Sequence, residues 1–316
     1  PALVGAGCDA FVVARVAEGV ALRLLAPTVR IFVLDGAPAG SIAALDTYRL
    51  TPVLNSLDEI SAWSEAGRAA HTALEAAVHI DTGMNRLGLS GDDVSVLAAE
   101  HAARLAGVKV VLWVSHLACS DEPDSPMNGA QLARFRAALA KLPPAPASLS
   151  ASGGIMLGKD YHFDLVRPGI CLYGGNPMPP RKNPFATAVR CLATILQVRH
   201  ANPGETAGYG ATFKVARPSL LAVVGMGYAD GLMRRAAAGG GAAVNGVRVP
   251  LAGRVSMDLA TLDVTGVKPT PVAGTAAEFF GDIVSLDEFA ASAGTISYEI
   301  LTQLSRRAAR SYEEAA

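Results

Sequence analysis

The first half of the chain alternates short apolar runs with longer amphipathic segments, a pattern typical of repeated strand–helix units. It predicts helices at 56–70, 92–105 and 129–142, and strands at 11–14, 31–34, 51–54, 76–80, 110–115, 147–150 and 165–167. Ser56 and Asp92 are the expected N-caps of the first two helices. These seven strands are one fewer than a closed (β/α)8 barrel needs.

The start of the chain bears on the missing strand. Residues 1–7 look like the tail of a helix that ends in glycine, without a helix before it. We therefore expect an α/β fold, a (β/α)8 TIM-type barrel whose first βα unit is missing from this chain.

Beyond the turn-rich segment 176–184, short alternating strands replace the strand–helix pattern. The predicted strands lie at 193–198, 220–224, 246–250 and 257–264. The sequence thus predicts two domains, an incomplete barrel at 1–185 and a mostly β domain at 186–316. The run of alanine and glycine at 236–243 is predicted to be a flexible surface loop.

Composition narrows the function classes. The chain is 51% hydrophobic with a formal net charge of −1, and its Lys/Arg clusters are no longer than pairs, which argues against nucleic acid or a membrane surface. No apolar stretch is long enough to span a bilayer. The four cysteines are scattered without a CxxC, which predicts a reducing cytoplasm and no metal site. We expect a small-molecule site in a cytoplasmic protein.

Two charged or titratable residues follow predicted strands, at the end where barrels place their active sites. Arg86 lies between two glycines in segment 81–88 and could clamp a carboxylate, or it could be a solvated loop arginine. His116 follows strand 110–115, where a lone histidine is more often a satisfied core residue than a catalyst.

Two further strand ends carry polar residues. Ser152 precedes Gly153 and Gly154, and this turn could offer a hydroxyl and N–H groups to a phosphate, although such turns are common. Arg167 ends the last strand and precedes Pro168 and Gly169.

A tyrosine in the second half adds a different chemistry. Tyr209 stands between Gly208 and Gly210, so the backbone that carries its phenol can bend freely. A phenol with a pKa near 10 accepts a proton only if neighbouring groups lower that pKa.

Six motifs share one order and spacing across both halves, and with them the chain resembles the bacterial alanine racemases that depend on pyridoxal phosphate. In that family a pyridoxal phosphate-binding (β/α)8 barrel precedes a β domain. The motifs are 81–88, 167–174, 208–213, 227–231, 253–258 and Tyr298-Glu299-Ile300 ahead of Ser305-Arg306-Arg307.

The resemblance implies interconversion of L- and D-alanine by two-base proton transfer, supplying D-alanine for peptidoglycan. Tyr209 would be the base on the L-alanine face, and His116 and Arg167 would form a hydrogen-bonded chain behind the site. Arg167 would donate to the pyridine nitrogen of the cofactor. Because arginine does not give up its proton, that nitrogen would stay unprotonated and the ring would be a weaker electron sink.

The resemblance also implies the binding residues. Arg86 and the backbone of Met257 would hold the substrate carboxylate, and Tyr228 would line the substrate entrance. The chains would pair as a head-to-tail homodimer in which Tyr209 and Met257 of one protomer complete the site of the other. The cofactor phosphate would be bound by Ser152, Gly169, Ile170 and Tyr298.

Three positions depart from the family pattern. The family's cofactor-bearing lysine lies in a Lys-Ala-(Asn/Asp)-Ala-Tyr-Gly segment, which does not occur in these 316 residues. We expect a fragment of a longer polypeptide rather than a natural pseudoenzyme, and the chain as printed should not racemise. His79 stands where many members have a carbamylated lysine, and Ala151 stands where an asparagine is frequent.

Three alternatives stay open at this point. A serine or broad-specificity amino-acid racemase would differ by a small change in the pocket. A pyridoxal phosphate decarboxylase shares the architecture, but we expect it to place an acid where this chain has Arg167. A non-catalytic pyridoxal phosphate-binding protein would fit a chain without the lysine.

Overall fold

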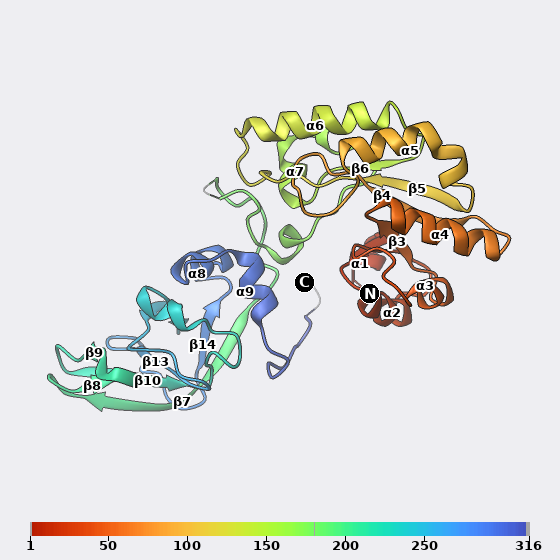
Figure 1. Ribbon diagram of the computed structural model, residues 1–316. Coiled ribbons are helices and arrows are strands. Elements are labelled where there is room, and N and C mark those ends of the chain that lie inside the picture. Colours follow the sequence, from red (N-terminus) through yellow and green to blue (C-terminus); the bar gives the residue numbers. More distant parts are fainter. Residues whose placement is uncertain (1, 180, 314–316) are drawn as a thin grey trace. The chain divides into compact units, whose positions relative to one another are not determined.

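The computed structural model describes residues 2–179 and 181–313, which form two compact units. The first unit comprises the chain up to Gly169 together with 177–179, and the second comprises Ile170–Asn176 and the residues from Arg181 onward. Figure 1 shows the elements of each unit along the chain.

The first unit is built on a sheet of strands that are all parallel, in the order β1-β2-β3-β4-β5-β6. Each strand follows its predecessor in sequence and lies beside it in space, with a helix in every connection from β1 to β6 (Figure 1). The strands are β1 (Ala10–Val13), β2 (Arg30–Val33), β3 (Thr51–Leu54), β4 (Leu74–His79), β5 (Val108–Val114) and β6 (Ala147–Ser148). The helices are α1 (Ala2–Gly5), α2 (Val16–Leu25), α3 (Ile42–Thr47), α4 (Leu57–Ala69), α5 (Gly91–Arg104), α6 (Pro126–Leu139) and α7 (Ser152–Leu157).

Both faces of this sheet are covered. Ile31 and Val78 pack with helix residues such as Trp63 in the main core cluster. Their neighbours Phe32 and Ala77 belong to a smaller cluster made almost entirely of strand residues. Because successive strand side chains point to opposite faces, the strands read as continuous apolar runs, as expected for a buried parallel sheet.

The structure confirms six of the predicted strands in this unit and corrects the seventh. Segment 165–167 forms no strand and makes a single parallel bridge, between Ala151 and Arg167. Pro168 follows at once and has no N–H to extend a ladder. Among the described residues the sheet is therefore open, and β1 pairs on one side only, with β2.

Helix boundaries follow their caps. Ser56 is the N-cap of α4, as predicted, and its hydroxyl accepts a hydrogen bond from the N–H of Glu59. The prediction of Asp92 as a cap was wrong, because Ser90 caps α5 in a capping box with Asp93 and leaves Asp92 in the first turn. Helix α6 begins at Pro126, earlier than predicted.

The second unit is mainly antiparallel, with the sheet order β12-β11-β14-β7-β10-β13. Its strands are β7 (Cys191–Ala201), β10 (Ser219–Val224), β11 (Gly241–Val244), β12 (Val247–Pro250), β13 (Ala260–Asp263) and β14 (Ala276–Phe280). Between β7 and β10 in the chain, β8 (Thr206–Ala207) and β9 (Phe213–Lys214) form a separate two-stranded sheet. Helices α8 (Leu286–Ser292) and α9 (Ser297–Gln303) end the unit. The sequence pattern did not predict β14 or either helix.

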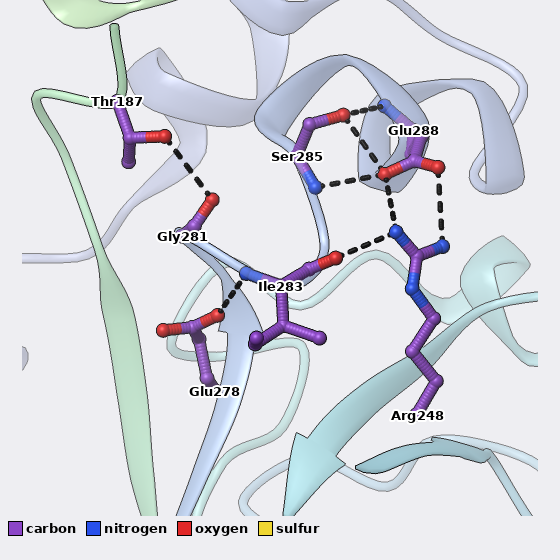
Figure 2. A network of polar contacts seen from close by, with 7 residues as sticks. All are labelled: Thr187, Arg248, Glu278, Gly281, Ile283, Ser285 and Glu288. Carbon is purple, nitrogen blue, oxygen red and sulfur yellow. Dashed lines mark hydrogen bonds and ion pairs between the residues drawn. The ribbon is translucent and has the colours of Figure 1, made fainter. Parts of the chain in front are cut away.

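Figure 2 shows how α8 is attached to this sheet. Ser285 and Glu288 form a capping box at the start of the helix. Arg248 of β12 donates to both carboxylate oxygens of Glu288 at 3.0 and 3.1 Å, and to the carbonyl oxygen of Ile283 at 2.6 Å. The hydrogen bond from Arg248 is the main reason why the pKa of Glu288 is below its ordinary value.

The prediction of a flexible loop at 236–243 was wrong. A 3-10 helix, Arg234–Ala238, covers the first part of this segment, and β11 begins at Gly241, after Gly239 and Gly240. Ala236, Ala242 and Ala243 are buried in the core of the second unit. A Cβ at Gly241 would lie 2.1 Å from the carbonyl oxygen of Val249, so the small side chains permit close packing here instead of mobility.

In the part of the chain that the structure describes, no helix combines the length and apolar character needed to cross a bilayer.

The cap of α4 yields a prediction. Replacing Ser56 by Ala removes the bond to the Glu59 N–H and should lower the free energy of unfolding of the first unit by about 1 kcal/mol. Both tryptophans, Trp63 and Trp113, lie in the core of this unit, so their fluorescence in a urea titration reports its unfolding.

Ser125 provides the matched control. It is the N-cap of α6 but makes no side-chain cap hydrogen bond. Ser125→Ala should change the free energy of unfolding by no more than about 0.5 kcal/mol. Equal losses in the two variants would contradict the role assigned to the Ser56 hydroxyl.

Candidate active site

An arginine is enclosed at the carboxyl ends of β5 and β6. The Arg167 guanidinium donates to the carbonyl oxygens of Ser115 and Leu149 at 2.7 and 3.2 Å, and to the hydroxyl of Ser148. Burial lowers the pKa of Arg167 to about 10, so the group remains charged at neutral pH. Its described hydrogen bonds use both terminal nitrogens and leave Nε available to a ligand.

His116 lies next to this charge. Nη2 of Arg167 is 3.4 Å from Nδ1 of His116, and since arginine can only donate, Nδ1 is the acceptor. Burial, with a further contribution from Arg167, lowers the pKa of His116 to about 4. His116 is therefore neutral at pH 7 and carries its proton on Nε2, which can donate to another group.

His79 is held in the opposite tautomer. The Asn55 amide nitrogen donates to the carbonyl oxygens of Leu34 and Val53, which identifies its Oδ1 as the acceptor of the 2.9 Å bond with Nδ1 of His79. The His79 proton is thus on Nδ1, and Nε2 has a free lone pair. Burial, then Arg167, lowers the pKa of His79 to about 4, so it is also neutral.

The loop that carries Arg86 is organised by one carboxylate. Asp81 accepts hydrogen bonds of 2.9 to 3.2 Å from the backbone N–H groups of Gly83, Met84 and Asn85. The charge of the exposed Arg86 is a minor cause of the lowered pKa of both His79 and His116.

A buried polar network supports the backbone of His116. Gln131 of α6 donates to the His116 carbonyl oxygen at 2.9 Å and to the Thr82 hydroxyl at 3.0 Å, and accepts from the N–H of Ala118 at 2.8 Å. Thr82 in turn contacts the hydroxyl of Ser115 at 2.9 Å. The network connects the loop that carries Arg86 to the segment after β5 that carries His116.

The donors for an anionic group lie at the start of α7. The Gly169 N–H donates to the Ser152 hydroxyl at 2.8 Å, which brings two predicted phosphate ligands together. A Cβ at Gly169 would meet nothing within 4 Å, so space is open beside it. A serine hydroxyl, the first turn of a helix and a nearby guanidinium form a donor set that fits a phosphorylated heterocycle.

The remaining predicted site residues belong to the second unit. Tyr209 begins a short 3-10 turn, Tyr209–Ala211, and its flanking glycines Gly208 and Gly210 have φ of 76° and 75°. Both glycines thus adopt the backbone conformation for which glycine is favoured. The Tyr209 side chain is 68% exposed.

Three more of these residues are also accessible, while one is buried. Tyr228, Met257 and Tyr298 are exposed by 46%, 54% and 45%, whereas Ile170 is 4% exposed. Five of the predicted site residues belong to the first unit: Arg86, His116, Ser152, Arg167 and Gly169. The other five belong to the second unit: Ile170, Tyr209, Tyr228, Met257 and Tyr298.

Four supporting residues were missed by reasoning from the sequence. Asn55, Ser115 and Ser148 end or follow buried strands, the same signal that pointed to His116. Gln131 could have been found as one of two polar residues, with Asn128, in the buried stripe of α6.

A parallel strand–helix sheet with an enclosed arginine, two neutral histidines and a serine turn at its strand ends, followed by an antiparallel β unit, defines a class. It is the class of two-domain barrel enzymes that hold an anionic cofactor. Residues 1–177 match the family model of the alanine racemase N-terminal domain, and residues 188–312 match that of the alanine racemase C-terminal domain.

Relatives support the same assignment. The chain is 46% identical to a catabolic alanine racemase of Agrobacterium fabrum, covering 97% of this chain and 79% of that protein. It is 46% identical to an alanine racemase of Rhodospirillum rubrum, covering 99% and 84%. The crystal structure of the Bartonella henselae alanine racemase, which has covalently bound pyridoxal phosphate, is similar with a TM-score of 0.92 at 35% identity over 97% of this chain and 86% of that one. The chain belongs to the alanine racemase family.

The two neutral histidines generate a pH prediction. Above pH 6.5 the folded and unfolded states both hold these rings neutral. Between pH 6.5 and about 4 only the unfolded state takes up the protons, so stability is lost as the pH falls. Each ring should contribute up to about 1.4 kcal/mol per pH unit to this slope.

Tryptophan fluorescence in urea, repeated at several pH values, measures the slope. His116→Gln and His79→Gln should each flatten it, whatever they do to stability at neutral pH. His101→Gln is the control, since His101 lies exposed on α5. A wild-type slope in both site variants would contradict the burial-induced pKa shifts.

Proposed function

We propose that the complete protein is a homodimeric racemase that interconverts L- and D-alanine and supplies D-alanine for peptidoglycan. The observation that carries the proposal is the charged Arg167 guanidinium beside the neutral His116, in a chain that matches alanine racemases over nearly its full length.

Pyridoxal 5'-phosphate is the cofactor of this family, and when bound it supplies the electron sink that makes the α-proton of an amino acid acidic. Ser152, Gly169, Ile170 and Tyr298 would hold its phosphate. The Arg167 guanidinium would donate to its ring nitrogen. With a pKa of about 10 this arginine keeps its own proton at neutral pH, so it orients the ring without protonating it.

Proton transfer on the L-alanine face is assigned to Tyr209. Its oxygen would take or return the α-proton, and the Nε2 proton of neutral His116 would stabilise the phenolate by donating to that oxygen. The fixed charge of Arg167 behind His116 favours the same anion. Since Tyr209 is 68% exposed in the single chain, we propose that it completes the site of a second, head-to-tail protomer.

The substrate carboxylate is assigned to Arg86 and the backbone N–H of Met257, with Tyr228 at the entrance. Where relatives carry a carbamylated lysine, this chain offers the lone pair of His79 Nε2, because Asn55 holds the proton on Nδ1. A neutral acceptor can orient the Arg86 guanidinium by a hydrogen bond, although without the attraction of an anion.

We further propose that a strand–helix unit with the cofactor-bearing lysine, which would be the second base, belongs to the complete protein and lies outside these 316 residues. The open edge of the parallel sheet at β1 supports this, since exposed parallel edges are unfavourable. The domain boundary near residue 185 and the cytoplasmic location stay predictions.

One experiment tests both parts of the proposal. The protein purified from its natural source is weighed intact and assayed for conversion of L-alanine and, in parallel, L-serine. We expect a mass above the 32.5 kDa of the 316 residues, and racemisation with alanine preferred. A mass of 32.5 kDa would overturn the missing unit, and a heavier protein that racemises neither amino acid would overturn the function.

A variant tests the base. Tyr209→Phe should lower racemisation by about a thousandfold or more, because it removes the only group assigned to the proton on the L-alanine face. The cofactor's visible spectrum should stay unchanged, since no cofactor contact is assigned to Tyr209. Tyr312→Phe, at a tyrosine that is 90% exposed, is the control. Near-normal racemisation by Tyr209→Phe would remove Tyr209 from the mechanism.

A further inference from the structure

One arginine near the end of the chain bridges two motif loops of the second unit. The Arg307 Nη1 is 2.9 Å from a carboxylate oxygen of Asp258, and its Nε is 3.3 Å from one of Asp230. Asp230 belongs to the loop 227–231, and Asp258 follows Met257 in the loop 253–258. The side chain of Asp230 is only 17% exposed, so this half of the bridge is poorly screened by water.

The two loops are also joined directly. The N–H of Tyr228 donates to the carbonyl oxygen of Ser256 at 3.0 Å, and the N–H of Ala229 donates to that of Met257 at 2.9 Å. The contact is so close that a Cβ at Gly227 would lie 2.2 Å from the carbonyl oxygen of Met257. The two loops therefore pack together as one body. The relative positions of the residues that they carry depend on the distance between the two loops.

The residues around Arg307 fix it in place. The N–H of Ser305 donates to the carbonyl oxygen of Asp230 at 3.1 Å, and the N–H of Arg307 donates to the Ser305 hydroxyl at 3.0 Å. A Cβ at Gly231 would lie 2.6 Å from the carbonyl oxygen of Gln303. Arg307 thus reaches both acids from a backbone that is itself docked on the 227–231 loop.

The same body extends to the tyrosine turn. A Cβ at Gly253 would lie 2.6 Å from the carbonyl oxygen of Ala207, and one at Gly208 would lie 3.0 Å from the N–H of Arg254. The backbone next to Tyr209 thus packs directly on the loop that ends at Met257 and Asp258.

We propose that Arg307 is a positioning residue that locks the 227–231 and 253–258 loops together and so sets the spacing of Tyr228 and Met257. That these loops serve an alanine site rests on the proposed function, whereas the lock itself does not. The hydrogen bond to Asp258, followed by the charge of Asp230, raises the pKa of Arg307.

Hydrogen–deuterium exchange on the complete protein, without substrate, tests the lock apart from catalysis. In Arg307→Gln the amides of Tyr228 and Ala229 should exchange about threefold to tenfold faster, while the ladder between β7 and β10 keeps its wild-type protection. Arg306→Gln is the matched control, because the adjacent exposed Arg306 makes no described ion pair. Its exchange should equal that of the wild type.

Two further variants separate positioning from a general loss of structure. Arg307→Lys should give an intermediate rate, since a single ammonium reaches one acid and not both. Asp258→Asn should accelerate the same amides, and combining it with Arg307→Gln should add little. Wild-type rates at Tyr228 and Ala229 in Arg307→Gln, or faster exchange throughout the unit, would overturn the lock.

Activity provides a separate readout. In protein that racemises alanine, Arg307→Gln should raise KM by a larger factor than it lowers kcat, because Met257 is assigned to substrate binding. If the wild type does not racemise alanine, the proposed function is wrong. The exchange rates then still test whether Arg307 holds the two loops together.

Discussion

The enclosed positive charge of Arg167 is the interaction on which the rest of the first unit's site depends. Carbonyl oxygens of Ser115 and Leu149 and the hydroxyl of Ser148 satisfy the guanidinium. A carboxylate in their place would lower the local potential and favour protonated histidines. With neutral oxygens around it, Arg167 instead helps to keep His116 and His79 neutral, and a neutral His116 can donate a hydrogen bond from Nε2.

The second unit depends on close backbone contacts rather than on an enclosed charge. At Gly227, Gly231 and Gly253 a Cβ would lie 2.2 to 2.6 Å from a carbonyl oxygen of a facing segment. These contacts pack the loops that carry Tyr228 and Met257 against one another, and the Met257 loop against the backbone beside Tyr209. The ion pairs of Arg307 with Asp230 and Asp258 add an electrostatic link between two loops that the glycines allow to pack closely.

The strands of the first unit were predictable because a parallel sheet buried on both faces leaves long apolar runs, as in β3 and β5. The wrong predictions relied on local sequence patterns that the folded structure overrides. Segment 165–167 has the apolar pattern of a strand, but Pro168 ends the ladder after one bridge. The alanine and glycine run at 236–243 has the composition of a linker, yet it includes buried alanines, and Gly241 allows β11 to pack closely on β12.

By itself the sequence determined the order of strand–helix units followed by β strands, and the motifs that identify the family, because these are properties of neighbouring residues. It also pointed to Arg167, His116 and Tyr209 individually. Only the tertiary structure decided the two histidine tautomers, since the partner of each ring nitrogen, Asn55 or Arg167, comes from a segment far away in the chain. The same holds for Gln131 and Arg307, whose roles arise from atoms that folding alone brings within hydrogen-bond distance.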